Sequence, residues 1–106
     1  MAPRKLSLAT IRKVALALPG VEEGTSYGTP AFRFRKKLIA RLHQDGVSLV
    51  LKIGNETRDH LLQADPDTFF VTDHYRGYPI VLARLNRLTA TDLDKLLRHA
   101  TTGATR

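Results

Sequence analysis

The sequence of 106 residues predicts one α+β domain: an N-terminal helix, an antiparallel β-meander with hairpin wings, a short helix, a further strand and a C-terminal helix. Three observations predict this class. Apolar and polar residues alternate from residue 27 to residue 53, as in antiparallel strands. Two flanking stretches carry apolar residues at helical spacing, and turn residues separate these segments. We expect a single domain over residues 1–106 with its core at 7–100.

The first helix should begin at Ser7, because a serine hydroxyl can accept a backbone N–H from the first helical turn. Pro19-Gly20 should end it. The apolar stripe that faces the core is predicted to be Leu8, Ile11, Ala15 and Leu18.

The register of the meander decides which side chains face the core. A two-residue turn at Asp45-Gly46 would pair Leu42 with Leu49 and Ala40 with Leu51. For the preceding hairpin we expect a three-residue loop, Lys36 to Leu38, which pairs Phe32 with Leu42 and Phe34 with Ala40. The face predicted to be buried comprises Phe32, Phe34, Ala40, Leu42, Val47, Leu49, Leu51 and Ile53. The opposite, exposed face comprises Arg33, Arg35, Arg41, His43, Ser48, Val50 and Lys52.

The remaining helices and strand are predicted from residues that cap helices and residues that end them. Asn55 should cap a short helix over residues 56–64, and Asp65-Pro66 should close it. Residues 80–85 are too apolar for an exposed edge strand. Thr89 and Asp92 resemble a capping box at the start of the last helix. The buried stripe of that helix should be Leu93, Leu96, Leu97 and Ala100, with residues 101–106 as a frayed tail.

Composition narrows the function classes. The chain has no cysteine, which excludes disulfides, thiolate metal sites and a cysteine nucleophile. It shows no apolar run long enough for a signal peptide or a membrane span, so we expect a cytoplasmic protein without membrane contact. A net charge of +7 suits an anionic partner such as nucleic acid, although many basic proteins carry such charge only for solubility.

Several short segments follow one another in a characteristic order along the chain. They are Ala17-Leu18-Pro19-Gly20-Val21, Tyr27-Gly28-Thr29-Pro30-Ala31-Phe32, Lys37 with Ile39-Ala40, Leu49-Val50-Leu51-Lys52, Tyr75-Arg76-Gly77 and a closing helix at 93–97. In this order the sequence resembles the MmcQ/YjbR family. The resemblance implies a compact α+β fold with paired hairpin wings, described as DNA-binding-like. Two departures are the missing tryptophans near Tyr27 and Ile80, and Lys36 in place of a turn glycine.

The principal candidate site is a basic hairpin that would neutralise phosphates in a sequence-tolerant, salt-sensitive contact with DNA. Its residues are Arg33, Arg35, Lys36, Lys37 and Arg41, with Arg12 and Lys13 as a second patch. An edge hairpin that uses cations only to deter aggregation is the structural alternative.

A second candidate is a small-ligand or protein-interaction site formed by the loop after the short helix. Its residues are Tyr27, Tyr75, Arg76 and Tyr78. A concave pocket lined by tyrosines would favour this candidate, and a flat basic ridge would favour nucleic acid.

No catalytic signature is recognisable in the sequence. The histidines at 43, 60, 74 and 99 lack metal-site spacing, and no nucleophile motif or phosphate loop occurs. We therefore expect a binding domain rather than an enzyme, with no metal and no cofactor. A catalytic constellation assembled only in space is the remaining alternative.

Overall fold

The computed structural model describes residues 6–104. Within that range one antiparallel sheet of six strands is combined with three α-helices and two short 3-10 helices. The α-helices are α1 (Leu8–Leu16), α2 (Asn55–Ala64) and α3 (Ala90–Ala104). The strands are β1 (Val21–Ser26), β2 (Thr29–Phe34), β3 (Lys37–Leu42), β4 (Ser48–Lys52), β5 (Phe69–Phe70) and β6 (Ile80–Arg84). The 3-10 helices are η1 (Asp73–Tyr75) and η2 (Leu85–Arg87). This architecture confirms the predicted α+β class.

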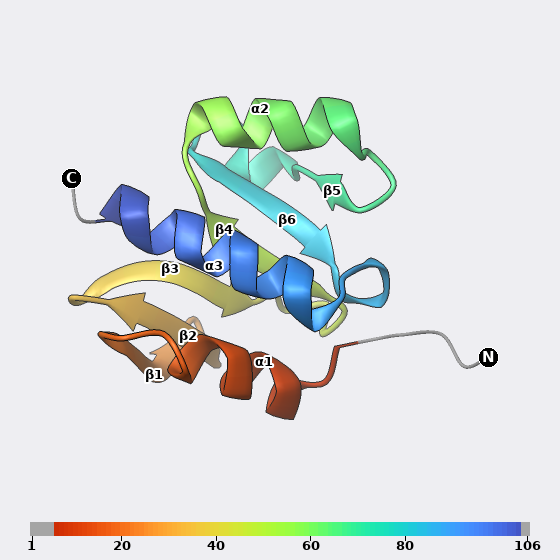
Figure 1. Cartoon of the computed structure of the whole chain (residues 1–106). Coiled ribbons are helices and arrows are strands. Elements are labelled where there is room, and N and C mark those ends of the chain that lie inside the picture. The colour runs from red at the N-terminus through yellow and green to blue at the C-terminus, as the bar shows by residue number, and fades with distance from the viewer. Residues whose placement is uncertain (1–5, 105–106) are drawn as a thin grey trace.

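The strands lie in the order β1-β2-β3-β4-β6-β5 across the sheet. Helices α1 and α3 pack against each other and cover one face of the sheet, while α2 lies near the end formed by β5 and β6 (Figure 1). Strand β6 (Ile80–Arg84) runs between β4 and β5, which confirms that this segment is not an exposed edge strand, while Leu85 already belongs to η2.

The main core lies between the sheet and helices α1 and α3. Strand residues of this core include Phe32, Ile39, Ala40, Leu49 and Leu51, all of which are buried. Every residue of the stripe predicted for α3 is buried. Of the stripe predicted for the first helix, Ile11, Ala15 and Leu18 are buried, with Leu18 just after the end of α1. Leu8 is only half-buried, so its predicted place in the core is wrong. A second, smaller apolar cluster lies on the opposite face of the sheet, where Tyr75 packs over Val50 and Leu82. The sheet is therefore covered on both faces.

The predicted helix starts are confirmed at both ends of the chain. The Ser7 hydroxyl accepts the Thr10 backbone N–H at 3.1 Å. Thr89 and Asp92 form a reciprocal capping box, because each backbone N–H donates to the other residue's side chain, at 3.2 and 3.1 Å. Both helices thus begin where their own side chains satisfy free backbone donors.

The β3–β4 register is confirmed, since Ala40 pairs with Leu51 and Leu42 with Leu49. The connection is wider than a two-residue turn, however. The Gly46 N–H donates to the His43 carbonyl at 3.0 Å, and the Asp45 carboxylate accepts the N–H groups of Val47 and Ser48 at 2.9 and 3.0 Å. This loop leaves Val47 49 % exposed, so the prediction that Val47 is buried is wrong.

The hydrogen bonds of Asp45 make the loop sensitive to acid. Partial burial alone would raise the pKa of Asp45, but the donors on Val47 and Ser48 and the nearby His43 together lower it. Its charged form therefore stabilises the fold fully above the ordinary carboxyl pKa of about 3.9. That contribution is lost as the pH falls below this value, through the lowered pKa of the folded state.

We expect Asp45→Asn to cost about 0.5–1.5 kcal/mol of unfolding free energy at pH 7, because the charge-assisted hydrogen bonds are weakened. Urea unfolding of the wild type and the variant at pH 7 and pH 3 measures this cost. The difference between the two proteins should shrink at pH 3, where the other carboxyl groups affect both alike. An equal difference at both pH values would contradict a charge-dependent role for Asp45.

The β2–β3 connection differs from the predicted three-residue loop. Phe34 pairs with Lys37 and Phe32 with Ala40, which leaves a two-residue turn at Arg35-Lys36, and the register shifts between Phe32 and Arg33. Both turn residues have positive φ, at 51° and 70°. This conformation usually requires glycine or asparagine, so two cationic residues gave no signal for it.

Four further differences have local causes. Strand β1 was not predicted, because its sequence Val-Glu-Glu-Gly-Thr-Ser lacks alternation and only Val21 is buried. Asn55 is not the N-cap of α2: that position is Gly54, at φ 96°, and no side chain caps it.

Phe69–Phe70 form a short strand against β6 where only a loop was expected. The frayed tail was wrong for residues 101–104, where α3 continues and the hydroxyls of Thr101 and Thr102 donate to the Arg98 carbonyl. Residues 105–106 lie outside the described part of the chain.

Candidate functional site

The five cations of the predicted basic hairpin do not share one surface. Arg41 was expected on the exposed face but is only 3 % exposed. The expectation was wrong because that face of the sheet is covered by the segment around η1, and the Arg41 guanidinium donates to the Tyr75 hydroxyl beneath it. Val50, also predicted to be exposed, is buried under the same segment. The prediction that Ser48 is exposed is wrong as well, because Ser48 is buried and its hydroxyl donates to the Asp45 carboxylate at 2.9 Å.

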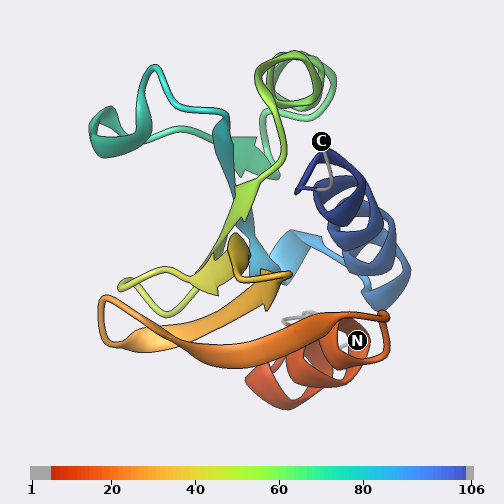
Figure 2. The same ribbon diagram turned by 90° about the vertical axis from the view of Figure 1, so that its left-hand side faces the viewer.

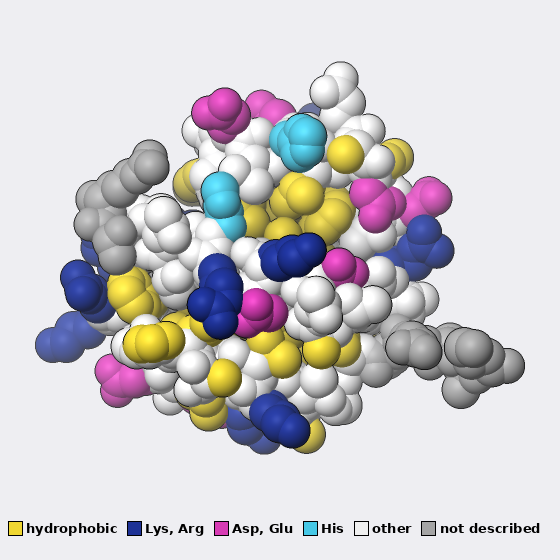
Figure 3. Space-filling model, viewed as in Figure 1, with side chains coloured by type: hydrophobic (Ala, Val, Ile, Leu, Met, Phe, Trp, Pro, Cys, Tyr) yellow, Lys and Arg dark blue, Asp and Glu magenta, His cyan; other side chains and the backbone are white. Residues whose placement is uncertain are grey.

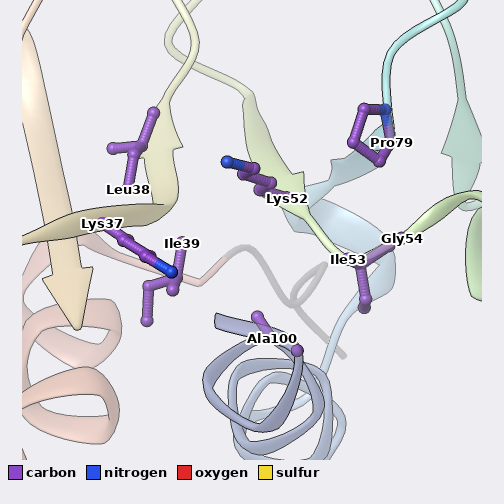
Figure 4. Close-up of a pocket in the computed structure, with 9 residues that line it drawn as sticks. Lys37, Leu38, Ile39, Lys52, Ile53, Gly54, Pro79 and Ala100 are labelled. Atoms are coloured by element: carbon purple, nitrogen blue, oxygen red, sulfur yellow. The ribbon is translucent and has the colours of Figure 1, made fainter. Parts of the chain in front are cut away.

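The other four cations point in different directions. Arg35 and Lys36 are exposed at the tip of the turn, and the Arg35 guanidinium lies 5.2 Å from the centre of the Phe34 ring. Arg33 is half-buried and donates to the Thr25 carbonyl at 3.2 Å. Lys37 turns toward the end of α3, where it lines a pocket with Ile39 and Lys52 (Figure 4). Lys37 is exposed as well, but it is directed toward α3, which leaves Arg35 and Lys36 as the two adjacent cations at the tip of the hairpin.

The second predicted basic patch is partly neutralised. Arg12 donates to the Glu23 carboxylate at 2.6 Å, and this hydrogen bond raises the pKa of Arg12. Lys13 is exposed in the last turn of α1. On the face of the molecule shown in Figure 3, cationic side chains are scattered among acidic and neutral ones and form no continuous ridge.

The buried guanidinium of Arg41 instead lines a pocket on the sheet face opposite α1 and α3. The turn between β1 and β2, the loop between β3 and β4, and the η1 segment all extend to this side (Figure 2). The pocket has a volume of about 380 Å³ and is lined by Tyr27, Arg41, His43, Gln44, His74 and Tyr75. We refer to it as the tyrosine–arginine pocket.

Every hydrogen-bond acceptor of Arg41 in the described chain is a neutral oxygen. Nη1 donates to the Thr29 hydroxyl at 3.2 Å and to the Leu42 carbonyl at 3.3 Å, and Nη2 donates to the Tyr75 hydroxyl. No carboxylate of residues 6–104 forms an ion pair with Arg41. A guanidinium carries five N–H donors, so Nε and one hydrogen of Nη2 have no acceptor among these residues.

Two aromatic rings enclose this guanidinium. Its central carbon lies 5.3 Å from the centre of the Tyr27 ring and 6.0 Å from that of Tyr75, within the range of cation–π attraction. His43 lies beside them, and its Nδ1 is buried without a hydrogen-bond partner in the described structure. The pocket thus combines one buried positive charge, aromatic walls and one buried polar nitrogen without a partner.

The structure brings together two of the four residues predicted to form a tyrosine pocket. Tyr27 and Tyr75 meet although 48 positions separate them in the chain. Arg76 and Tyr78 do not line the pocket. Arg76 pairs instead with the exposed Asp73 at 2.7 Å. The sequence reasoning missed Arg41, His43, Gln44 and His74 as members. A usable signal was the apolar residue Val50 on the supposedly exposed face, which indicates that something covers it.

Other candidate chemistry is sparse within the described residues. No group of three histidine or acidic side chains is placed to hold a metal ion. None of the described helices has the length and apolar character needed to cross a bilayer.

Comparison with known proteins shows which family has this architecture. The YjbR family model matches residues 16–100, most of the chain. The chain belongs to the YjbR family. This YjbR chain is also similar to the crystal structure of the Deinococcus radiodurans protein DR2400, a DUF419 domain. The TM-score is 0.76 at 24 % identity, over 99 % of this chain and 82 % of the other. At that identity the likeness shows a common fold.

The curated relatives match a shorter segment. Uncharacterised proteins of Mycobacterium tuberculosis (Rv2570) and Mycobacterium bovis (Mb2600) are each 40 % identical over 40 residues. The matched segment covers 38 % of this chain and 31 % of each relative. Family membership therefore accounts for the fold, and function has to be argued from the pocket.

Proposed function

We propose that this YjbR domain is a non-enzymatic binding module that holds a small anionic ligand in the tyrosine–arginine pocket. The observation that carries the proposal is the buried guanidinium of Arg41, which has no carboxylate partner. Burying a charge is costly unless an opposite charge and further hydrogen bonds offset the lost hydration. A bound carboxylate or phosphate would supply both.

The free donors of Arg41 match such a ligand. Two N–H groups without acceptors allow two hydrogen bonds to one oxyanion, the arrangement by which arginine binds carboxylate and phosphate most strongly. Pockets for small ligands are typically concave and apolar, with few polar groups, and the volume of about 380 Å³ lies at the small end of their range.

We expect wild-type protein to bind inorganic phosphate or acetate saturably, and Arg41→Gln to lose at least about tenfold in affinity, because hydrogen bonds to a charged group are removed. Titration followed by two-dimensional NMR would locate the binding, with chloride at matched ionic strength as the control. Arg41→Lys keeps the charge but not the planar fork, and should bind with intermediate affinity.

Two results would contradict the proposal. One is an absence of saturable anion binding to the wild type. The other is unchanged affinity in folded Arg41→Gln, with the fold verified by circular dichroism and thermal unfolding.

A second candidate function is contact with nucleic acid through the hairpin tip. It is favoured by one observation: Arg35 and Lys36 are adjacent, exposed and held by a tight turn. A projecting basic turn of this kind can approach phosphates along a groove. With Arg41 buried and Arg33 and Lys37 directed elsewhere, the contact would involve about two or three phosphates and would be weak and tolerant of sequence.

A further inference from the structure

We propose that the ligand of the tyrosine–arginine pocket is an aromatic ring that bears an oxyanion, a carboxylate or a phosphate. This inference rests on the proposed function above and narrows its ligand class. In this arrangement the oxyanion contacts Arg41, and the ring of the ligand contacts Tyr27.

Tyr27 is the residue that points to a ring. Its side chain is 81 % exposed, although it stands beside a buried guanidinium. Large aromatic side chains gain most of their stabilising effect from burial, which Tyr27 largely forgoes at this position. An exposed ring at the mouth of a pocket offers a face on which a planar ligand can stack.

The backbone at Tyr27 strengthens this argument. Tyr27 and Gly28 form the turn between β1 and β2 with φ of 52° and 79°. Positive φ at both positions is the conformation that asparagine followed by glycine adopts most readily. Tyrosine is therefore a strained choice at this position, and strained residues tend to gather at functional sites.

The other walls of the pocket suit the same ligand class. The His74 and Tyr75 rings meet edge to face, with centres 4.8 Å apart and planes at 83°, and His43 lies 6.5 Å from Tyr75. These rings form an aromatic side to the pocket. The buried Nδ1 of His43 adds one hydrogen-bonding position for a polar substituent of the ligand.

The test compares ligands that share a head group but differ in the ring. Affinities for benzoate and phenyl phosphate are measured against those for acetate and inorganic phosphate, by NMR titration of the whole chain. We expect each aromatic anion to bind about tenfold more tightly than its ring-free counterpart, because stacking and apolar burial are added. Comparing the benzoate and phenyl phosphate pairs identifies which head group the pocket prefers.

The matched variants are Tyr27→Asn and Tyr27→Phe. Tyr27→Asn removes the ring and supplies the residue that the turn favours, so its melting temperature should be unchanged or higher. It should lose the preference for aromatic anions over acetate and phosphate. Tyr27→Phe retains the ring and should retain the preference.

The outcomes separate the two proposals. Equal affinity of the wild type for aromatic and ring-free anions, or a full aromatic preference in Tyr27→Asn, overturns the aromatic ligand class and leaves the anion site standing. Failure of all four anions to bind the wild type overturns the proposed function itself.

Discussion

Replacing Leu49 with alanine should lower the free energy of unfolding by about 2–5 kcal/mol, the cost of a cavity in a packed core. Leu49 is 0 % exposed and sits on β4 between Leu42 and Ala83 of the neighbouring strands. Since a domain of this size is stable by only about 5–15 kcal/mol, the variant should lose a large fraction of its stability. Urea unfolding monitored by circular dichroism measures the change.

Val47→Ala is the control for this measurement. Val47 lies two positions earlier, where the alternation of the sequence also predicted burial, but it is 49 % exposed. Truncating it should change the unfolding free energy by no more than about 0.5 kcal/mol. Similar losses in both variants would contradict the observed core, because they would mean that the loop after β3 packs as tightly as β4.

The contrast between Val47 and Leu49 shows what local pattern can predict. Alternation placed Phe32, Leu49 and Leu51 in the core correctly and set the β3–β4 register, because turn position and apolar spacing agree there. Helix starts were equally local, since Ser7 and the Thr89–Asp92 pair bond within a single turn. Such features depend on residues a few positions apart, which a sequence displays directly.

The pocket could not be predicted in the same way. Burial of Arg41 depends on Tyr75, which lies 34 positions later and is brought over the sheet by the segment around η1. Alternation assigns residues to two faces but does not say whether the second face is covered. The sequence analysis assumed that one face of the antiparallel sheet is exposed to solvent, and it therefore predicted that Arg41 is exposed.

The prediction of a three-residue loop between β2 and β3 was wrong for another reason. Arg35 and Lys36 both adopt positive φ, which their residue types disfavour, so the sequence pointed to a longer loop. Arg33 donates to the Thr25 carbonyl, and Lys37 lines a pocket beside α3. Fewer cations therefore gather at the tip of the hairpin than the sequence predicted.

The small number of cations at the hairpin tip predicts how strongly DNA binding should depend on salt. With two or three phosphate contacts, the logarithm of the association constant should fall with the logarithm of the salt concentration at a slope of roughly −2 to −3. Arg35→Ala combined with Lys36→Ala should flatten the slope by about 2 and weaken binding roughly 100-fold at 50 mM salt. Both side chains are exposed, so the fold should persist. Fluorescence anisotropy on a labelled DNA duplex across a salt series measures both quantities.

A charge-matched control decides whether position or total charge matters. Lys95→Ala combined with Arg98→Ala removes the same two charges from the exposed side of α3. If the hairpin tip contacts phosphates, this control should keep the wild-type slope, because counterion release counts only cations placed at the DNA. Equal weakening in both double variants would mean that the net charge of +7 attracts DNA without a defined site. Absence of binding by the wild type at 20 mM salt would assign Arg35 and Lys36 to solubility and aggregation resistance at the hairpin tip.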